Sequence, residues 1–106
     1  MAAYVIAQMT VNDVNMYYDY AAKIFSTTGP FGGKILAAND AEVREGSLPH
    51  VRTVIGEFPD IEKARAWYES AAYKEIIGLR QNATDGTLFL VEGMTMPPRP
   101  KAEAGQ

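Results

Sequence analysis

The fold is decided by the stretch Arg52-Thr-Val-Ile-Gly-Glu-Phe-Pro-Asp-Ile-Glu-Lys-Ala-Arg-Ala-Trp-Tyr-Glu-Ser-Ala-Ala-Tyr73. Its first part is rich in β-branched and aromatic side chains, which predicts a strand over residues 51–58. Pro59 has no backbone N–H with which to continue a sheet, and Asp60 is a favourable N-cap for a helix. Trp67 then falls beside the apolar face of that helix. The stretch therefore predicts a buried strand, an abrupt stop and a helix rich in aromatic residues.

The residues at the start of the chain predict a strand followed by a helix. Residues 4–11 are apolar and β-branched, as is typical of a strand. Asp13 is a good N-cap, and apolar residues after it recur at helical spacing as far as about Thr28. Gly29 predicts a left-handed C-cap, and Pro30 cannot continue a helix. The first helix is therefore expected to end at this Gly-Pro pair.

The remaining segments predict two more strands and a short helix. Residues 34–38 predict a strand that resumes over residues 42–45. After the second helix, a short further helix is expected over residues 73–81. Asp85-Gly86 predicts a turn, and residues 87–94 predict the last strand.

The element order is thus β-α-β-β-α-β, which predicts an α+β, ferredoxin-like fold. Right-handed crossovers place both helical regions on one face of a four-stranded antiparallel sheet with strand order 4-1-3-2. The strand segments 4–7 and 88–91 are apolar on both faces, yet the helices can cover only one face. A second copy of the same sheet is the simplest cover for the other face. We therefore expect an obligate homodimer.

The bulk composition predicts one soluble domain and excludes several classes of protein. The chain has 106 residues, a net charge of −3 and no cysteine, so it has no thiol chemistry, and its scattered basic residues argue against a nucleic-acid partner. No apolar run is long enough for a membrane helix, and cytoplasmic localisation is the default expectation. We expect a single domain over residues 1–95 and a disordered, proline-rich tail over residues 96–106.

Several segments together resemble a known family. In the family's order and spacing, the chain carries Ala3-Tyr4-Val5-Ile6, Gly32-Gly33-Lys34-Ile35-Leu36, Glu45-Gly46, Phe58-Pro59-Asp60, Ala66-Trp67-Tyr68-Glu69-Ser70, Tyr73, Leu79-Arg80 and Val91-Glu92-Gly93. It resembles the small bacterial proteins grouped as domain of unknown function 1330, within the dimeric α/β-barrel superfamily. The resemblance implies two ferredoxin-like subunits whose sheets close into a barrel. It implies no established reaction, since related proteins include cofactor-independent monooxygenases, haem proteins and small isomerases or lactonases.

Arg80 and the tyrosines are the first candidates for ligand binding. Arg80 falls on the apolar stripe of the short last helix, where its guanidinium could hold a carboxylate by two hydrogen bonds. The alternative is a structural pair with a local glutamate, or a stem that extends to solvent. Among the aromatic residues, Tyr20 and Tyr73 are expected to line a pocket between sheet and helices, whereas Trp67 and Tyr68 are expected in the core.

Four further residues complete the set of candidates. Glu57 is a candidate catalytic residue and Glu92 a candidate ligand-binding residue, because both lie near the ends of strands that flank the first strand. They are expected about 10 Å apart, and whether they share a face depends on register. Arg52 is a further ligand-binding candidate at the start of its strand. His50, the single histidine, is a weaker catalytic candidate because its unperturbed pKa of about 6.5 suits a general base.

These residues predict no metal site and no cofactor. One histidine without cysteine cannot hold zinc or non-haem iron unless several carboxylates converge on it. The sequence therefore leaves two functions open. The first is a small-molecule pocket in each subunit of a homodimer, in which a cofactor-independent enzyme acts on a small organic ligand. The alternative is a non-catalytic dimer that binds a metabolite or a protein partner.

Overall fold

The structure is a computed structural model, and it describes residues 1–94 and 99. Most of the expected C-terminal tail, residues 96–106, lies outside these described residues. The elements follow one another as β1 (Ala3–Val11), α1 (Val14–Thr28), η1 (Gly29–Phe31), β2 (Lys34–Asp40), β3 (Arg52–Phe58), α2 (Ile61–Glu69), α3 (Ala71–Ala83) and β4 (Thr84–Glu92). The predicted β-α-β-β-α-β order is confirmed, with the second helical region divided into α2 and α3. None of the described helices is both long and apolar enough to cross a membrane.

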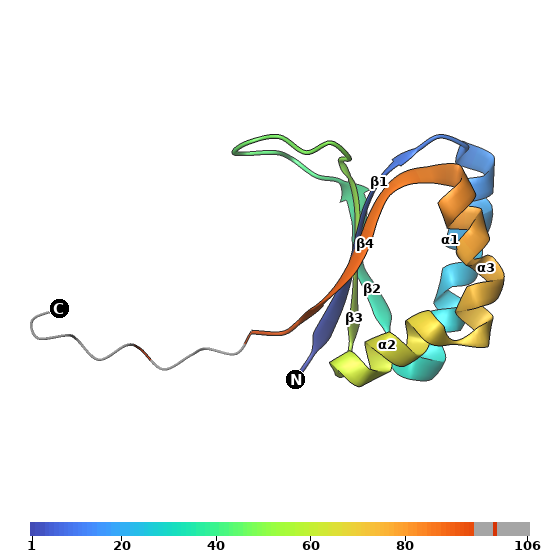
Figure 1. Cartoon of the computed structure of the whole chain (residues 1–106), viewed down its shortest axis with the longest axis vertical. Helices are drawn as coiled ribbons and strands as arrows, with labels where there is room; N and C mark the ends of the chain where they lie inside the picture. Colours follow the sequence, from blue (N-terminus) through green and yellow to red (C-terminus); the bar gives the residue numbers. More distant parts are fainter. Residues whose placement is uncertain (95–98, 100–106) are drawn as a thin grey trace, which may run out of the picture.

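The four strands form one antiparallel sheet in the order β2-β3-β1-β4, which is the predicted order. All three α-helices lie on one side of this sheet (Figure 1). Alternate residues of β1 face the helices, and Ala3, Val5 and Met9 are buried there. The other side of the sheet, which we call the open face, carries Ile6 and its register partner Phe89, whose side chain is 42% exposed. The described part of the chain therefore covers one apolar face of the sheet and leaves apolar side chains of the other face exposed.

Local capping explains where the helices begin. A carboxylate oxygen of Asp13 accepts a hydrogen bond from the Met16 amide at 3.0 Å, which caps α1. Asp60 caps α2 in the same way through the Lys63 amide at 2.8 Å. Ser70 separates α2 from α3 because its backbone is extended and its hydroxyl caps the new helix. The caps at Asp13 and Asp60 agree with the predicted helix starts, whereas α3 begins at Ala71, two residues before the predicted start at residue 73.

Residues 52–73 form much of the packing contact between the sheet and the helices. Phe58, Trp67 and Tyr73 are the largest fully buried side chains of the described residues. The Trp67 ring packs 5.4 Å from the Phe58 ring and 4.2 Å from the Tyr73 ring, measured between centroids. The Trp67 indole also donates a hydrogen bond to the Thr27 hydroxyl at 3.0 Å. Trp67 therefore joins β3, α1 and α3 in one core.

The end of α1 differs from the sequence-based expectation. Gly29 is not a left-handed cap: its backbone is right-handed helical, with φ of −52°, and the chain continues into η1. The left-handed residue is Gly32, with φ of 75°. A side chain there would also lie against the Pro59 ring. Pro30 is compatible with this arrangement because it occupies the start of a 3-10 helix, where its missing N–H costs nothing.

Two predicted boundaries are wrong. Residues 42–45 form no strand and belong to the loop between β2 and β3, where Glu42 and Arg44 form an exposed ion pair. Asp85-Gly86 forms no turn, because β4 already begins at Thr84 directly after α3. The chain reverses at Ala83 instead, whose carbonyl accepts hydrogen bonds from the Asn12 and Asp13 amides. Long-range pairing with β1 overrides the local turn signal at these residues.

Candidate functional site

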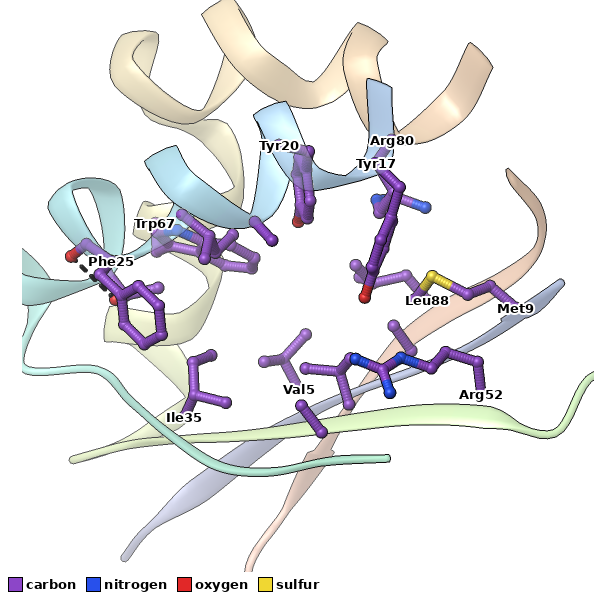
Figure 2. A pocket seen from close by; sticks show the side chains of 16 residues that line it. Val5, Met9, Tyr17, Tyr20, Phe25, Ile35, Arg52, Trp67, Arg80 and Leu88 are labelled. Carbon is purple, nitrogen blue, oxygen red and sulfur yellow. Dashed lines mark hydrogen bonds between the residues drawn. The ribbon is translucent and has the colours of Figure 1, made fainter. Parts of the chain in front are cut away.

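A cavity of about 110 Å³ lies between the helices and the sheet. Figure 2 shows its sixteen lining residues, which project from both layers. The helices supply Tyr17, Tyr20, Ala21, Ile24, Phe25, Thr28, Trp67 and Arg80. The sheet supplies Val5, Ala7, Met9, Ile35, Ala38, Arg52, Val54 and Leu88. The cavity wall is therefore mostly apolar, with two tyrosines and two arginines.

Three side chains from two helices form a hydrogen-bonded chain that ends at this cavity. The Arg80 Nε donates to the Tyr73 hydroxyl at 3.3 Å, and the Tyr73 and Tyr20 hydroxyls are hydrogen-bonded at 2.9 Å. Tyr73 is fully buried and lies behind the cavity wall, whereas Tyr20 and Arg80 are part of the wall. The structure thus brings together three of the ligand-binding candidates, Arg80, Tyr73 and Tyr20, through the packing of α1 against α3.

The protonation states of Tyr20 and Arg80 are set by burial and by the contact with Tyr73. Burial raises the pKa of Tyr20, and its interaction with Tyr73 raises it further, so Tyr20 remains a neutral phenol. Burial by itself lowers the pKa of Arg80, but the interaction and hydrogen bond with Tyr73 outweigh this effect and raise it. The Arg80 guanidinium is therefore a permanent cation, with only 8% of the residue exposed.

The positive charge of Arg80 has no carboxylate partner in the part of the chain that the structure describes. The ion pairs there join Lys34 to Glu57 and Arg44 to Glu42, and neither involves Arg80. The first structural alternative, a pair with a local glutamate, is not formed among the described residues, and only 8% of the Arg80 surface is exposed. A buried cation is costly unless an opposite charge accompanies it. The cavity consequently has one wall with an unbalanced positive charge.

Arg52 lies on the opposite wall, at the first residue of β3. Its register partner on β1 is Met9, so its side chain points toward the helices. The guanidinium carbon lies 5.8 Å from the centroid of the Tyr17 ring. In Figure 2, Arg52, Tyr17 and Arg80 lie toward one end of the cavity, and Phe25 and Ile35 lie toward the other. The structure therefore places Arg52 at the same cavity as Arg80 and Tyr20.

The two glutamate candidates do not belong to this site. Glu57 pairs with Tyr4 and Glu92 with Ala3, and consecutive residues of β1 point to opposite faces. Glu57 lies on the open face, where it forms an exposed ion pair with Lys34 at 3.4 Å. Glu92 lies on the helix side but is exposed at the end of β4. The register thus separates two residues that both flank the same end of β1.

His50 is also outside the cavity. It lies in the loop before β3, where its Nδ1 is hydrogen-bonded to the Thr10 hydroxyl at 2.8 Å. Thr10 is on the open face, because it alternates along β1 with the buried Met9. Among residues 1–94 and 99, no group of three His, Cys, Asp or Glu side chains is arranged to hold a metal ion.

Sequence reasoning did not single out Tyr17 within the aromatic cluster of the first helix. Tyr17 is 7% exposed, and its ring lies 6.3 Å from the Tyr20 ring. It lies three positions before Tyr20, on the same helix face, and this spacing was the available signal.

Beyond Arg80 and Leu88 lies a polar hollow, lined also by Tyr68, Gln81, Thr84, Asp85 and Gly86.

A comparison with family models gives a match over residues 2–94 to the family described as Domain of unknown function (DUF1330). The chain belongs to this family. The resemblance inferred from the sequence is thereby confirmed, and the DUF1330 domain includes every residue of the cavity. Among curated proteins, none is significantly similar in sequence to this DUF1330 chain.

Solved structures similar to this DUF1330 chain share its fold at low sequence identity. A protein of unknown function from Rhodopseudomonas palustris has a TM-score of 0.73 and 15% identity, with 90% of this chain and 84% of that chain covered. SnoaB, a cofactor-independent oxygenase from Streptomyces nogalater, has a TM-score of 0.64 and 11% identity, with 92% and 98% covered. HapK from Hahella chejuensis has a TM-score of 0.59 and 10% identity, with 90% and 95% covered. These similarities support the ferredoxin-like fold of the subunit and do not assign a reaction.

Proposed function

We propose that this protein binds a small organic anion in the cavity between sheet and helices. The observation that carries this proposal is the buried Arg80 cation, which has no carboxylate partner among the described residues and stands at the wall of an otherwise apolar cavity. An anionic ligand would supply the missing negative charge. Its apolar part would replace water against side chains such as Val5 and Leu88.

Tyr20 would contact the ligand's oxygen directly. Because the Arg80 Nε donates to the Tyr73 oxygen, the Tyr73 O–H is available to donate to Tyr20. The Tyr20 O–H can then donate into the cavity, and the cation at the other end of the hydrogen bonds polarises them in that direction. The cavity volume of about 110 Å³ is below that of an engineered protein cavity of about 150 Å³ that holds benzene, so one ring is the upper limit for the apolar part of the ligand. We therefore infer a small ligand, with at most one ring, that carries an acidic oxygen.

The test compares benzoate with benzamide, which has almost the same shape but no charge. Binding is followed by the fluorescence of Trp67, the single tryptophan, which lines the cavity, and by calorimetry. Benzoate should bind at least tenfold more tightly than benzamide, and Arg80→Gln and Tyr20→Phe should each reduce this preference. Arg65→Gln, at an exposed position on α2, is the matched control and should leave it unchanged. Equal binding of the two compounds by a folded wild-type protein would refute the proposal.

A second candidate function is cofactor-independent catalysis at the same site. It is supported by the protonated Tyr20 hydroxyl, which is suited to stabilise a negative oxygen that develops on a substrate. The likeness in fold to an oxygenase that needs no cofactor is compatible with it. The cavity lining contains no carboxylate or imidazole to act as a base, so the substrate would have to ionise by itself. Substrate-dependent oxygen uptake that Tyr20→Phe abolishes would support catalysis, whereas binding without turnover would favour the non-catalytic function.

We further propose that the functional unit is a homodimer formed through the open faces of two sheets. Ile6, Ile55 and Phe89 share this face in register, and Phe89 is 42% exposed. Such a continuous apolar surface is expected to be covered in a stable protein. The described helices cannot cover it, because they all pack on the other side of the sheet (Figure 1).

Light scattering coupled to size exclusion tests the dimer. At about 10 μM, a concentration at which a dimer with a sub-micromolar Kd stays associated, the wild-type protein should have twice the chain mass of 11.6 kDa. Phe89→Asp should shift it to the monomer mass. Val14→Asp introduces the same charge at a 56% exposed position of α1, away from the open face, and should not. A monomeric wild-type protein would contradict the proposed assembly without affecting the ligand-binding proposal.

A further inference from the structure

We propose that Arg52 is a second anion-binding residue of the cavity and that the ligand carries two negative charges. This inference rests on the proposed function, because it assumes that the cavity holds an organic anion against Arg80. It adds the chemical class of that anion: a small apolar body with two acidic groups at the same end. It also makes Arg52 the residue that distinguishes such a ligand from a monoanion.

The first argument is the charge balance of the cavity. Arg52 and Arg80 both line it, and its lining contains no Asp or Glu. Neither arginine forms an ion pair with a carboxylate of the described residues. Asp40 is the register partner of Arg52 on β2, yet the two side chains form no ion pair. The cavity lining therefore carries two positive charges and no negative one, so a monoanion could pair with only one of the two arginines.

The second argument is the placement of the two guanidinium groups. Arg52 reaches the Tyr17 ring from the sheet, with 5.8 Å between its guanidinium carbon and the ring centroid. Tyr17 packs against Tyr20, which is connected to Arg80 through Tyr73. Arg52 thus contacts Tyr17 from the sheet, whereas Arg80 is connected to Tyr20 through Tyr73 from the helical layer. Figure 2 places both at one end of the cavity, away from Phe25.

The third argument is the shape that this arrangement selects. Phe25, Ile35 and Trp67 line the part of the cavity that carries no charge. A ligand that satisfies both ends has an apolar ring directed toward these side chains and two anionic groups directed toward the arginines. Each guanidinium can bind one carboxylate through two parallel hydrogen bonds, so two arginines at one end of the cavity favour a ligand with two carboxylates over a ligand with one. An aromatic 1,2-dicarboxylate is the simplest compound with this pattern.

The experiment measures the binding of phthalate and benzoate by Trp67 fluorescence and calorimetry. The wild-type protein should bind phthalate at least tenfold more tightly than benzoate, and the difference should shrink at high salt. Arg52→Gln should reduce the preference for phthalate over benzoate to less than threefold. Arg52→Lys retains the charge without the fork and should retain part of the preference. Arg65→Gln is the matched control on the exposed side of α2.

The outcomes separate this inference from the proposed function. If benzoate binding depends on Arg80 but phthalate is not preferred, the two-charge inference is wrong and the anion-binding function stands. If phthalate is preferred equally in Arg52→Gln and wild type, Arg52 is not the second binding residue. If neither anion binds better than benzamide, both proposals fail. Circular dichroism of each variant establishes that a lost preference does not reflect a lost fold.

Discussion

Arg80 and Tyr73 lie seven positions apart on α3, and the Arg80 Nε donates a hydrogen bond of 3.3 Å to the Tyr73 hydroxyl. Seven residues are about two turns, so both side chains project from the same helix face toward α1. The Tyr73 hydroxyl connects this cation to Tyr20 on α1. The Tyr73 phenol therefore connects two helices and helps to set the protonation states of Tyr20 and Arg80 at the cavity.

Tyr73→Phe should destabilise the fold by about 1–3 kcal/mol, because it leaves the buried Arg80 Nε and Tyr20 hydroxyl without their common partner. It removes one oxygen and creates almost no cavity, so loss of packing is a minor contribution. Urea unfolding at fixed protein concentration measures the change. Tyr18→Phe removes the same atom from a residue that is 65% exposed and should change stability by less than about 0.5 kcal/mol. Equal stability of the two variants would show that the hydrogen-bonded chain contributes nothing.

The Trp67–Thr27 hydrogen bond should show coupling in a double-mutant cycle. Thr27→Val leaves the buried Trp67 indole N–H of this 3.0 Å bond unpaired and should cost about 1–3 kcal/mol. Trp67→Phe removes the indole donor and part of a buried ring, while the Thr27 hydroxyl keeps its hydrogen bond to the Ile24 carbonyl, and it should cost at least as much. The double variant should cost less than the sum of the two, by at least about 0.5 kcal/mol. Chemical unfolding of all four proteins gives the coupling energy. Strict additivity would mean that Trp67 acts through ring packing alone.

Gly86 and Gly78 should respond in opposite directions to the same substitution. Gly86 has φ of 157°, and a Cβ there would collide with the Gln8 carbonyl oxygen and the Met9 Cα. Gly86→Ala should therefore destabilise the protein by about 2–5 kcal/mol, through backbone strain and overpacking. Gly78 lies within α3, where an added Cβ meets nothing closer than 3.9 Å. Gly78→Ala should stabilise it by about 0.5–1 kcal/mol, because alanine has the higher helix propensity. Thermal unfolding of both variants checks the two signs.

Tyr20 should make the protein lose stability in alkaline solution. Burial raises the pKa of Tyr20 in the folded state, whereas in the unfolded chain it ionises near the usual value of 10.0. Above that pH the folded state retains a proton that the unfolded state has released, so the free energy of unfolding falls as pH rises. Below it both states are protonated and Tyr20 contributes no pH dependence. In unfolding experiments between about pH 8 and 11, Tyr20→Phe should make this decline shallower. A decline that is equally steep in Tyr20→Phe would rule out this origin.

Several features of the fold were predictable because they depend on neighbouring residues. The caps at Asp13, Asp60 and Ser70 require a side-chain oxygen three positions before the amide that it accepts from. The stop at Pro59 and the apolar character of the strands are also local. By contrast, Asp85-Gly86 has the composition of a turn but lies in β4, because pairing with β1 supplies hydrogen bonds that a local turn cannot. The strand predicted over residues 42–45 does not form, because no other strand pairs with these residues.

The sequence by itself determined the order of the elements, the family and the presence of an arginine on the apolar face of the last helix. Only the tertiary structure decided which residues meet at the cavity. Tyr20 and Tyr73 are 53 positions apart, and they share a hydrogen bond because α1 packs against α3. Register assigned Glu57 and Glu92 to opposite faces of the sheet, because their partners on β1 differ by one residue. Local patterns identify which face of an element is buried, whereas the convergence of distant side chains depends on packing and register that those patterns do not encode.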